Sequence, residues 1–264
     1  MFLHLPPRLH TEPLHSLPLV AVGEAMSSTL QRLHNGPLIP LTDDLLTIAE
    51  TGVPEALIDE LAVHVCPSNR RDRDSVLRKT YEEAALVEHV VPLVQRFAGG
   101  RYNLASLLHA VSALAFGQVQ FFRQVSAGII SDSLGRQIMF PAPADSLKML
   151  TDLDAPLRSQ LLSSYTLAAV LAMVGVIHAH PFADGNGRIA RILFAAILRW
   201  GSQRSVFIPV LALQSLSYPS FLVRARRAQC QGDWAPIVNH MASALEFLRT
   251  NATILTSLSA EQGD

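Results

Sequence analysis

The stretch HPFADGNGRIAR, His180 to Arg191, interrupts a long apolar part of the chain. The residues LAAVLAMVGVIHA lie before it, and ILFAAILRW follows it. Two apolar runs of this length, separated by a short polar loop, predict a hairpin of two buried helices. We place these helices at about residues 156–179 and 186–200. The polar loop between them is therefore the feature of the sequence that needs an explanation.

Outward from this hairpin, most of the chain has helical periodicity. The further predicted helices cover about residues 24–33, 42–50, 54–65, 74–97, 103–123, 145–153, 217–231 and 234–258. Two short β-prone runs, Val125–Ile130 and Arg136–Phe140, flank the turn-forming residues SDSLG and predict a β-hairpin. The predicted fold class is mainly α with one β-hairpin. We divide the chain into an N-terminal arm of unknown role, residues 1–70, and a helical domain, residues 71–264.

The composition excludes several function classes. Of the 264 residues, 49% are hydrophobic and 16% are charged, with a formal net charge of −1, so we expect a sizeable core and no nucleic-acid partner. The longest apolar run, Leu167 to Ile177, is too short to span a bilayer, and the stretch MFLHLPPRLH lacks the pattern of a secretory signal. Cys66 and Cys230 lie outside any CxxC motif. We expect a cytoplasmic protein, or one delivered into a host cell without a classical signal peptide.

The polar loop combines the residue types that bind a polyphosphate. Glycine-flanked backbone N–H groups at residues 185–188, at the start of a helix, form a nest for anions. Arg188 and Arg191, three residues apart, project from one face of that helix and suggest more than one phosphate group. Asp184 beside a polyphosphate is a natural Mg²⁺ ligand. His180 is a candidate general base at neutral pH.

Each of these residues also has a purely structural interpretation. A Gly-Asn-Gly turn is an ordinary connection between helices, and Asp184 alone is an acceptable N-cap. Arg191 alone can pair with a distant carboxylate, and a histidine at a helix end is often a structural group. Taken together, however, a buried loop with two arginines and one aspartate lacks local counter-ions. The combination therefore favours an anionic ligand.

Every specified position of the stretch matches HxFx(D/E)GNGRxxR, and the chain thereby resembles the Fic-domain family. Leu107-Leu108-His109 looks like the family's early helix, and Phe182 looks like its buried anchor. The β-hairpin, followed by Pro141-Ala142-Pro143, looks like its flap. The resemblance covers about residues 100–235, and residues 1–70 resemble no family that we can name.

The resemblance implies a protein adenylyltransferase, which moves AMP from ATP to a Ser, Thr or Tyr hydroxyl of a target protein. In this scheme His180 is the general base and Asp184 holds Mg²⁺. Gly185, Asn186, Gly187 and Arg188 would bind the phosphates, and Arg191 the γ-phosphate. Ile129 and Ile130 in the flap would clamp the target as an added strand.

Two other functions stay open. An enzyme of the same fold that uses UTP or CDP-choline would carry the same motif. An inactive nucleotide-binding or interaction module is the second alternative, which the intact His180, Asp184 and arginines disfavour. Gly187 stands where the kinase-like Doc branch of the family has a lysine, and this favours AMP transfer.

Many relatives in this family carry an inhibitory helix with (S/T)xxxE(G/N), whose Glu pairs with the second motif arginine. No full match occurs here. Ser257 to Glu261 has the spacing, and Thr51 to Glu55 has it with Pro54 inside. Glu261 is the better candidate, and inhibition by a separate small antitoxin-like protein, or no inhibition at all, stays open. The pair His178 and His180 resembles a metal site only superficially, since residues i and i+2 of a helix face different ways.

Overall fold

The computed structural model describes residues 70–129, 138–203, 208–216, 218–231, 233–241 and 243–244. The order of elements is α4 (Arg70–Ala98), α5 (Leu104–Phe116), β1 (Gly128–Ile129), β2 (Ile138–Met139), α6 (Pro143–Ser163), α7 (Tyr165–Ala179), α8 (Asn186–Ser202), α9 (Val210–Leu216) and α10 (Tyr218–Gln231). The predicted class, mainly α with one β-hairpin, is confirmed. The predicted helices before residue 70 lie outside the described residues.

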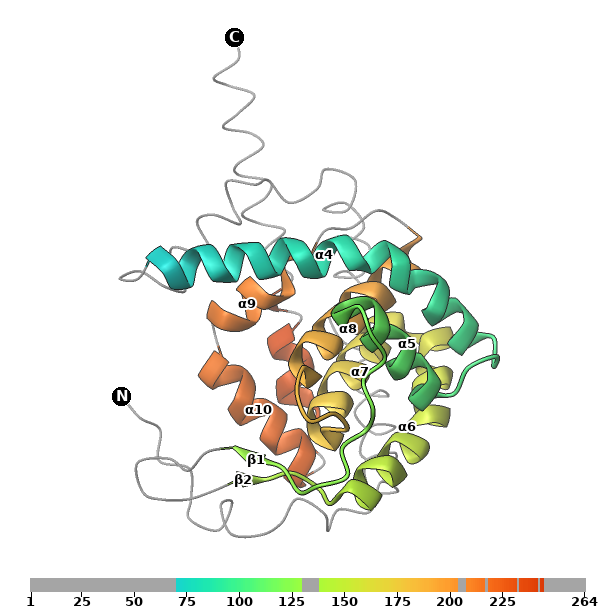
Figure 1. Ribbon diagram of the computed structural model, residues 1–264. Helices are drawn as coiled ribbons and strands as arrows, with labels where there is room; N and C mark the ends of the chain where they lie inside the picture. The colour runs from blue at the N-terminus through green and yellow to red at the C-terminus, as the bar shows by residue number, and fades with distance from the viewer. Residues whose placement is uncertain are drawn as a thin grey trace.

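The helical hairpin predicted around the polar loop forms the centre of the molecule. Helix α7 is apolar on every side and packs between α6 and α8, and α4 lies across α8. In Figure 1, α4 runs across the top of the view, with α7 and α8 beneath it. Most of α8 from Ile189 to Leu198 is also buried. The polar loop is therefore held between the two most buried helices described.

Helix α4 buries one stripe and begins earlier than predicted. The predicted start was Asp74 or Ser75, whereas the helix begins at Arg70. The buried side chains recur every three or four residues: Thr80, Glu83, Val87, Val90, Val94 and Phe97. Pro92 lies inside the helix on its exposed side, where water can replace the missing hydrogen bond. Glu83 is thus a carboxylate within an otherwise largely apolar stripe.

Helix α5 is shorter than predicted. Asn103 caps its start, because the Asn103 side chain accepts a hydrogen bond from the Ser106 backbone N–H at 2.8 Å. The prediction of a helix continuing to Arg123 is wrong: the helix ends at Phe116, where Gly117 adopts φ 70°. A left-handed glycine is a common end for a helix. The chain beyond it runs to Phe122, which forms an isolated antiparallel bridge with Phe182.

The predicted break between residues 153 and 156 is also wrong. Helix α6 continues through Pro156 to Ser163, and the break comes at Ser164, with φ −158° and ψ 88°. Leu153, Leu157 and Leu161 are buried along one face on both sides of the proline. Each such leucine contributes about 1.5–3 kcal/mol on burial, which outweighs a cost of about 3 kcal/mol for an interior proline.

Within the described residues, the flap pairs Gly128 with Met139 and Ile129 with Ile138 in an antiparallel arrangement, and residues 130–137 of the predicted hairpin lie outside them. Helix α9 was not predicted, since seven residues carry little periodicity. Helical residues from 235 to 241 fall within the helix expected at 234–258. Among the described helices, none has the length and apolar character needed to span a membrane.

Candidate active site

His180 ends α7 in an unusual backbone conformation. It has φ 48° and ψ 54°, the left-handed region, and its N–H donates to the Val176 carbonyl at 2.9 Å. A non-glycine residue stays in this region only when its surroundings hold it there. The His180 carbonyl accepts a hydrogen bond from Arg123 Nε at 2.7 Å, and the imidazole stacks on Phe140 with centroids 3.5 Å apart. Backbone and ring are therefore both fixed.

The loop after His180 is closed by Asn186. The Asn186 side chain accepts from the Phe182 N–H at 3.0 Å and donates to the Phe182 carbonyl at 2.8 Å. It is only 3% exposed, and Phe182 is 1% exposed. Both ends of the amide side chain are thus engaged within the loop. Any contact of Asn186 with a phosphate has to come from its backbone N–H rather than its side chain.

The start of α8 has the geometry of an anion site. Gly185 adopts φ 80°, and a Cβ there would lie 2.2 Å from Phe116 Cζ, so only glycine fits. The N-cap residue of α8 is Gly185, which has no side chain to cap the helix. The first backbone N–H groups of α8, at residues 186–188, therefore keep the donors that a helix N-terminus leaves unpaired. The nest predicted from the sequence has a matching backbone.

Asp184 is exposed beside this helix start. One of its carboxylate oxygens accepts the Gly185 N–H at 2.6 Å. Among the described residues, no three His, Cys, Asp or Glu side chains gather as a metal site. A single carboxylate fits Mg²⁺ that arrives with phosphates and water, the usual mode for that ion, and does not fit a metal held by protein alone.

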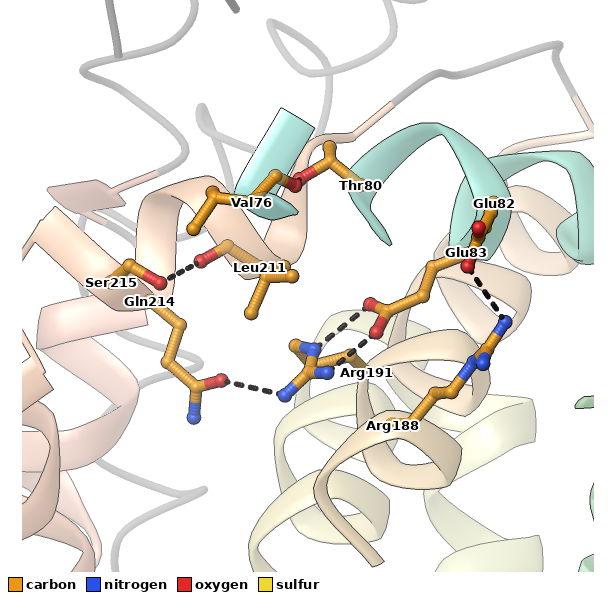
Figure 2. A network of polar contacts seen from close by, with 9 residues as sticks. All are labelled: Val76, Thr80, Glu82, Glu83, Arg188, Arg191, Leu211, Gln214 and Ser215. Carbon is orange, nitrogen blue, oxygen red and sulfur yellow. Dashed lines mark hydrogen bonds and ion pairs between the residues drawn. The ribbon is translucent and has the colours of Figure 1, made fainter. Parts of the chain in front are cut away.

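Both motif arginines contact acidic residues of α4 (Figure 2). Arg191 donates to Glu83 through Nε at 2.9 Å and Nη2 at 2.5 Å, and their side chains are 14% and 8% exposed. Gln214 of α9 accepts from Arg191 Nη1 at 3.4 Å on the other side. Arg188 Nη2 lies 3.5 Å from Glu82, while its buried Nε has no hydrogen-bond partner among the described residues. Carboxylates thus neutralise the arginines predicted to bind phosphates.

Glu83 is the partner of Arg191 that sequence reasoning missed. The search used (S/T)xxxE(G/N), but Thr80 lies three residues before Glu83 rather than four, and Ala84 follows it. The available signal was an acidic residue at a buried position of a predicted helix, because such a residue needs a cation. The earlier candidates, Glu261 and Glu55, lie outside the described residues.

Part of the chain matches a known protein family. The model of the Fic/DOC family matches residues 103–198, which hold α5, the flap, the loop and most of α8. These residues form a Fic domain. Proteins named "Protein adenylyltransferase Fic" are 32% identical in Drosophila erecta and 33% in Drosophila willistoni, over 108 residues. That match covers 40% of this chain and only 21% and 20% of those proteins.

The fold also resembles a solved structure. A Fic family protein from Desulfovibrio desulfuricans G20 superposes with a TM-score of 0.52 at 19% sequence identity. The alignment covers 93% of this chain and 77% of the other. This likeness supports the fold of the Fic domain, and the site residues rest on the motif and geometry above.

Aromatic rings pack against Phe182 in the loop of the Fic domain. The His109 ring stacks on Phe122 with centroids 4.1 Å apart, and Phe122 packs against Phe182 at 5.1 Å. His109, which looks like the histidine of the family's early helix, therefore packs on the ring that contacts Phe182, the anchor of the loop. In the flap, Ile129 pairs through its backbone with Ile138, while Ile130 lies outside the described residues. His178 is buried in α7.

The protonation of His180 gives a direct pH prediction for the Fic domain. Burial, followed by the Arg123 charge, lowers the pKa of His180 from 6.5 to about 4; Arg226 also lowers it, whereas the Ile177 backbone and the Asp184 carboxylate oppose the shift. A lowered pKa leaves the imidazole neutral above about pH 4, so it is a competent base throughout pH 5–8. Its contribution to stability is complete above 6.5 and is lost as pH falls toward 4.

We therefore expect the His180 ring resonances to titrate near pH 4 in an NMR experiment, well below the ordinary histidine pKa of 6.5. A His180 midpoint close to 6.5 would contradict the burial and charge environment described here.

Proposed function

We propose that this protein transfers AMP from Mg-ATP to a Ser, Thr or Tyr hydroxyl of a target protein. The observation that carries the proposal is the closed loop that joins His180, fixed in backbone and ring, to the N-terminus of α8. A base next to a phosphate-binding helix start is the arrangement that phosphoryl-type transfer needs. The adenylyltransferase names of relatives matching over 108 residues support the same reaction.

In this proposal, His180 accepts the proton of the target hydroxyl. The hydroxyl oxygen forms a bond to the α-phosphorus, the bond from that phosphorus to the bridging oxygen breaks, and pyrophosphate leaves with the electron pair. The N–H groups at residues 186–188 and Arg188 stabilise the phosphate oxygens as charge moves onto the leaving group. When bound at Asp184, Mg²⁺ would neutralise part of that charge. Arg191 would bind the γ-phosphate.

The Glu83–Arg191 pair gives the proposed enzyme an inhibited resting state. The arginine that would bind the γ-phosphate is engaged twice by a nearly buried carboxylate. A phosphate and this carboxylate are both bidentate acceptors for one guanidinium, so they compete for it. Glu82 on Arg188 adds a second, weaker competitor at 3.5 Å. We infer that Glu83 has the inhibitory role for which the sequence offered only Glu261 and Glu55.

The proposal is tested by incubating the Glu83→Gln protein with a cell lysate and ATP, GTP, CTP or UTP, each labelled at the α-phosphate, or CDP-choline labelled at the phosphate next to choline. We expect label from ATP to enter protein in this reaction. We expect none to enter when the enzyme also carries His180→Ala. Label from UTP alone assigns another donor to the same site. Absence of labelling from every donor would overturn transfer as the function.

Arg191→Ala tests the two roles of the arginine separately. The change removes the γ-phosphate contact and leaves Glu83 buried without its cation. Breaking a buried pair from one side typically costs about 3–5 kcal/mol of stability, so we expect a lower melting temperature by calorimetry. We also expect weaker ATP binding and no gain in transfer, although the inhibitory pair is gone. A rise in transfer for this variant would contradict the γ-phosphate role.

A further inference from the structure

Arg123, between α5 and β1, is a buried cation with unusual partners. Its side chain is 5% exposed, and burial lowers the pKa of its guanidinium. Within the described ranges of the chain, no carboxylate forms an ion pair with it. A buried charge normally requires such a partner or a complete set of hydrogen bonds. Arg123 instead has a backbone carbonyl at each of its three guanidinium nitrogens, since Nε and both terminal nitrogens each donate to one.

The three carbonyls belong to different parts of the site. Nε donates to His180 at 2.7 Å, Nη1 donates to Val125 at 3.0 Å, and Nη2 donates to Pro141. Val125 precedes β1 by three residues, and Pro141 follows β2 by two. We call these two residues the flap ends. One rigid, planar guanidinium group therefore connects the base residue to both flap ends.

The main chain around Arg123 strengthens this connection. The Arg123 N–H donates to the Pro181 carbonyl at 2.8 Å, directly after His180. At the exit of the flap, the Phe140 N–H donates to the Ala127 carbonyl at 2.9 Å, and the Phe140 ring covers the His180 ring at an angle of 9°. Arg123 thus contacts the backbone of His180, and Phe140 at the end of the flap contacts the imidazole of His180.

His180 needs such support because of its left-handed backbone. A non-glycine residue at φ 48° is strained, and it keeps this conformation only when several neighbouring contacts hold it there. The bond from Arg123 to the His180 carbonyl sets the orientation of that peptide group. The same positive charge also favours the neutral imidazole that a base requires.

We propose that Arg123 is a positioning residue that couples the flap to the base: it orients His180 through hydrogen bonds that also require both flap ends in place. This inference rests on the proposed function for its catalytic readout. It makes the geometry of the base depend on the segment expected to hold the target. Within the described residues, the Arg123 side chain donates to His180, Val125 and Pro141 and to no residue of α8, so we expect nucleotide binding to be independent of the coupling.

The experiment compares Arg123→Lys with Arg158→Lys, both in the Glu83→Gln protein. Lysine keeps the charge but cannot span three carbonyls. Arg158 is a matched control, since it also donates to two backbone carbonyls, those of Phe97 and Tyr102, at a corner built by α6, α4 and the start of α5. Turnover, the ATP dissociation constant and the NMR shifts of the His180 ring are measured in both.

We expect Arg123→Lys to lower turnover by about 10- to 100-fold, as for a displaced catalytic group, with ATP affinity unchanged. The His180 ring resonances should lose the upfield shift caused by the stacked Phe140 ring. Arg158→Lys should change neither. Unchanged His180 resonances and turnover in Arg123→Lys, or equal losses in both variants, would overturn the proposal.

Phe140→Leu is the second variant, needed if Arg123→Lys does not fold. It removes the ring over His180 and retains an apolar side chain; we expect lower turnover with ATP affinity retained, and unchanged turnover would contradict the coupling. If no variant transfers nucleotide at all, the proposed function fails. The His180 resonances of Arg123→Lys and Arg158→Lys then decide the positioning role alone.

Discussion

Replacing Glu83 with glutamine is expected to raise the transfer rate by about 10- to 100-fold, since each tenfold step corresponds to about 1.4 kcal/mol of released competition for Arg191. The substitution keeps the size of the side chain and removes its charge. Arg191 then loses its bidentate carboxylate and becomes available to a phosphate. The measurement is the initial rate of label transfer from α-labelled ATP at a fixed target concentration.

Glu88→Gln is the matched control for this prediction. Glu88 also lies on α4 and also pairs with an arginine of α8, Arg199, at 2.7 Å. That pair is more exposed, with 58% of the Glu88 side chain accessible, and it lies away from the polar loop. Exposed pairs contribute little, so its loss should leave the rate unchanged. Equal rates for the wild-type, Glu83→Gln and Glu88→Gln proteins would remove the inhibitory role of Glu83.

Replacing His180 is expected to have the second large effect. General base catalysis contributes about 10²- to 10⁴-fold, and we expect His180→Ala in the Glu83→Gln protein to lose transfer by that factor. ATP affinity should change little, because the N–H groups of α8 and the two arginines are intact. The rate and the ATP dissociation constant are measured on the same preparations.

His180→Asn is the companion variant. Asparagine tolerates the left-handed backbone of this position better than alanine, so it preserves the loop while removing the base. Both variants should therefore lose transfer, and His180→Asn should retain more stability. Transfer that survives in His180→Asn would show that another group accepts the proton.

The sequence was sufficient for the centre of the fold and for the loop. Apolar runs on both sides of residues 180–191 made α7 and α8 predictable, and Gly185 required the turn that the structure shows. The boundaries that failed depended on packing. Pro156 stays helical because buried leucines flank it, and α5 stops at Gly117 although the apolar pattern continues.

The contacts of the site were less predictable than its motif. Glu83 and Arg191 are 108 positions apart in the sequence, and Arg123 and His180 are 57 apart. No local spacing therefore predicts either contact. Asn186 was assigned to phosphates by the motif, whereas its buried side chain closes the loop. A motif identifies the residues near a reaction, but burial and hydrogen-bond partners decide which polar atoms of each side chain remain free to bind a ligand.

The position of the transferred label tests the central claim most directly. The Glu83→Gln protein is incubated with a target lysate and ATP labelled at either the α- or the γ-phosphate, with Glu83→Gln/His180→Ala in parallel. We predict that protein acquires the α-label and no γ-label, and that the double variant acquires neither. Incorporation of the γ-label, or α-label transfer that persists without His180, would contradict this account.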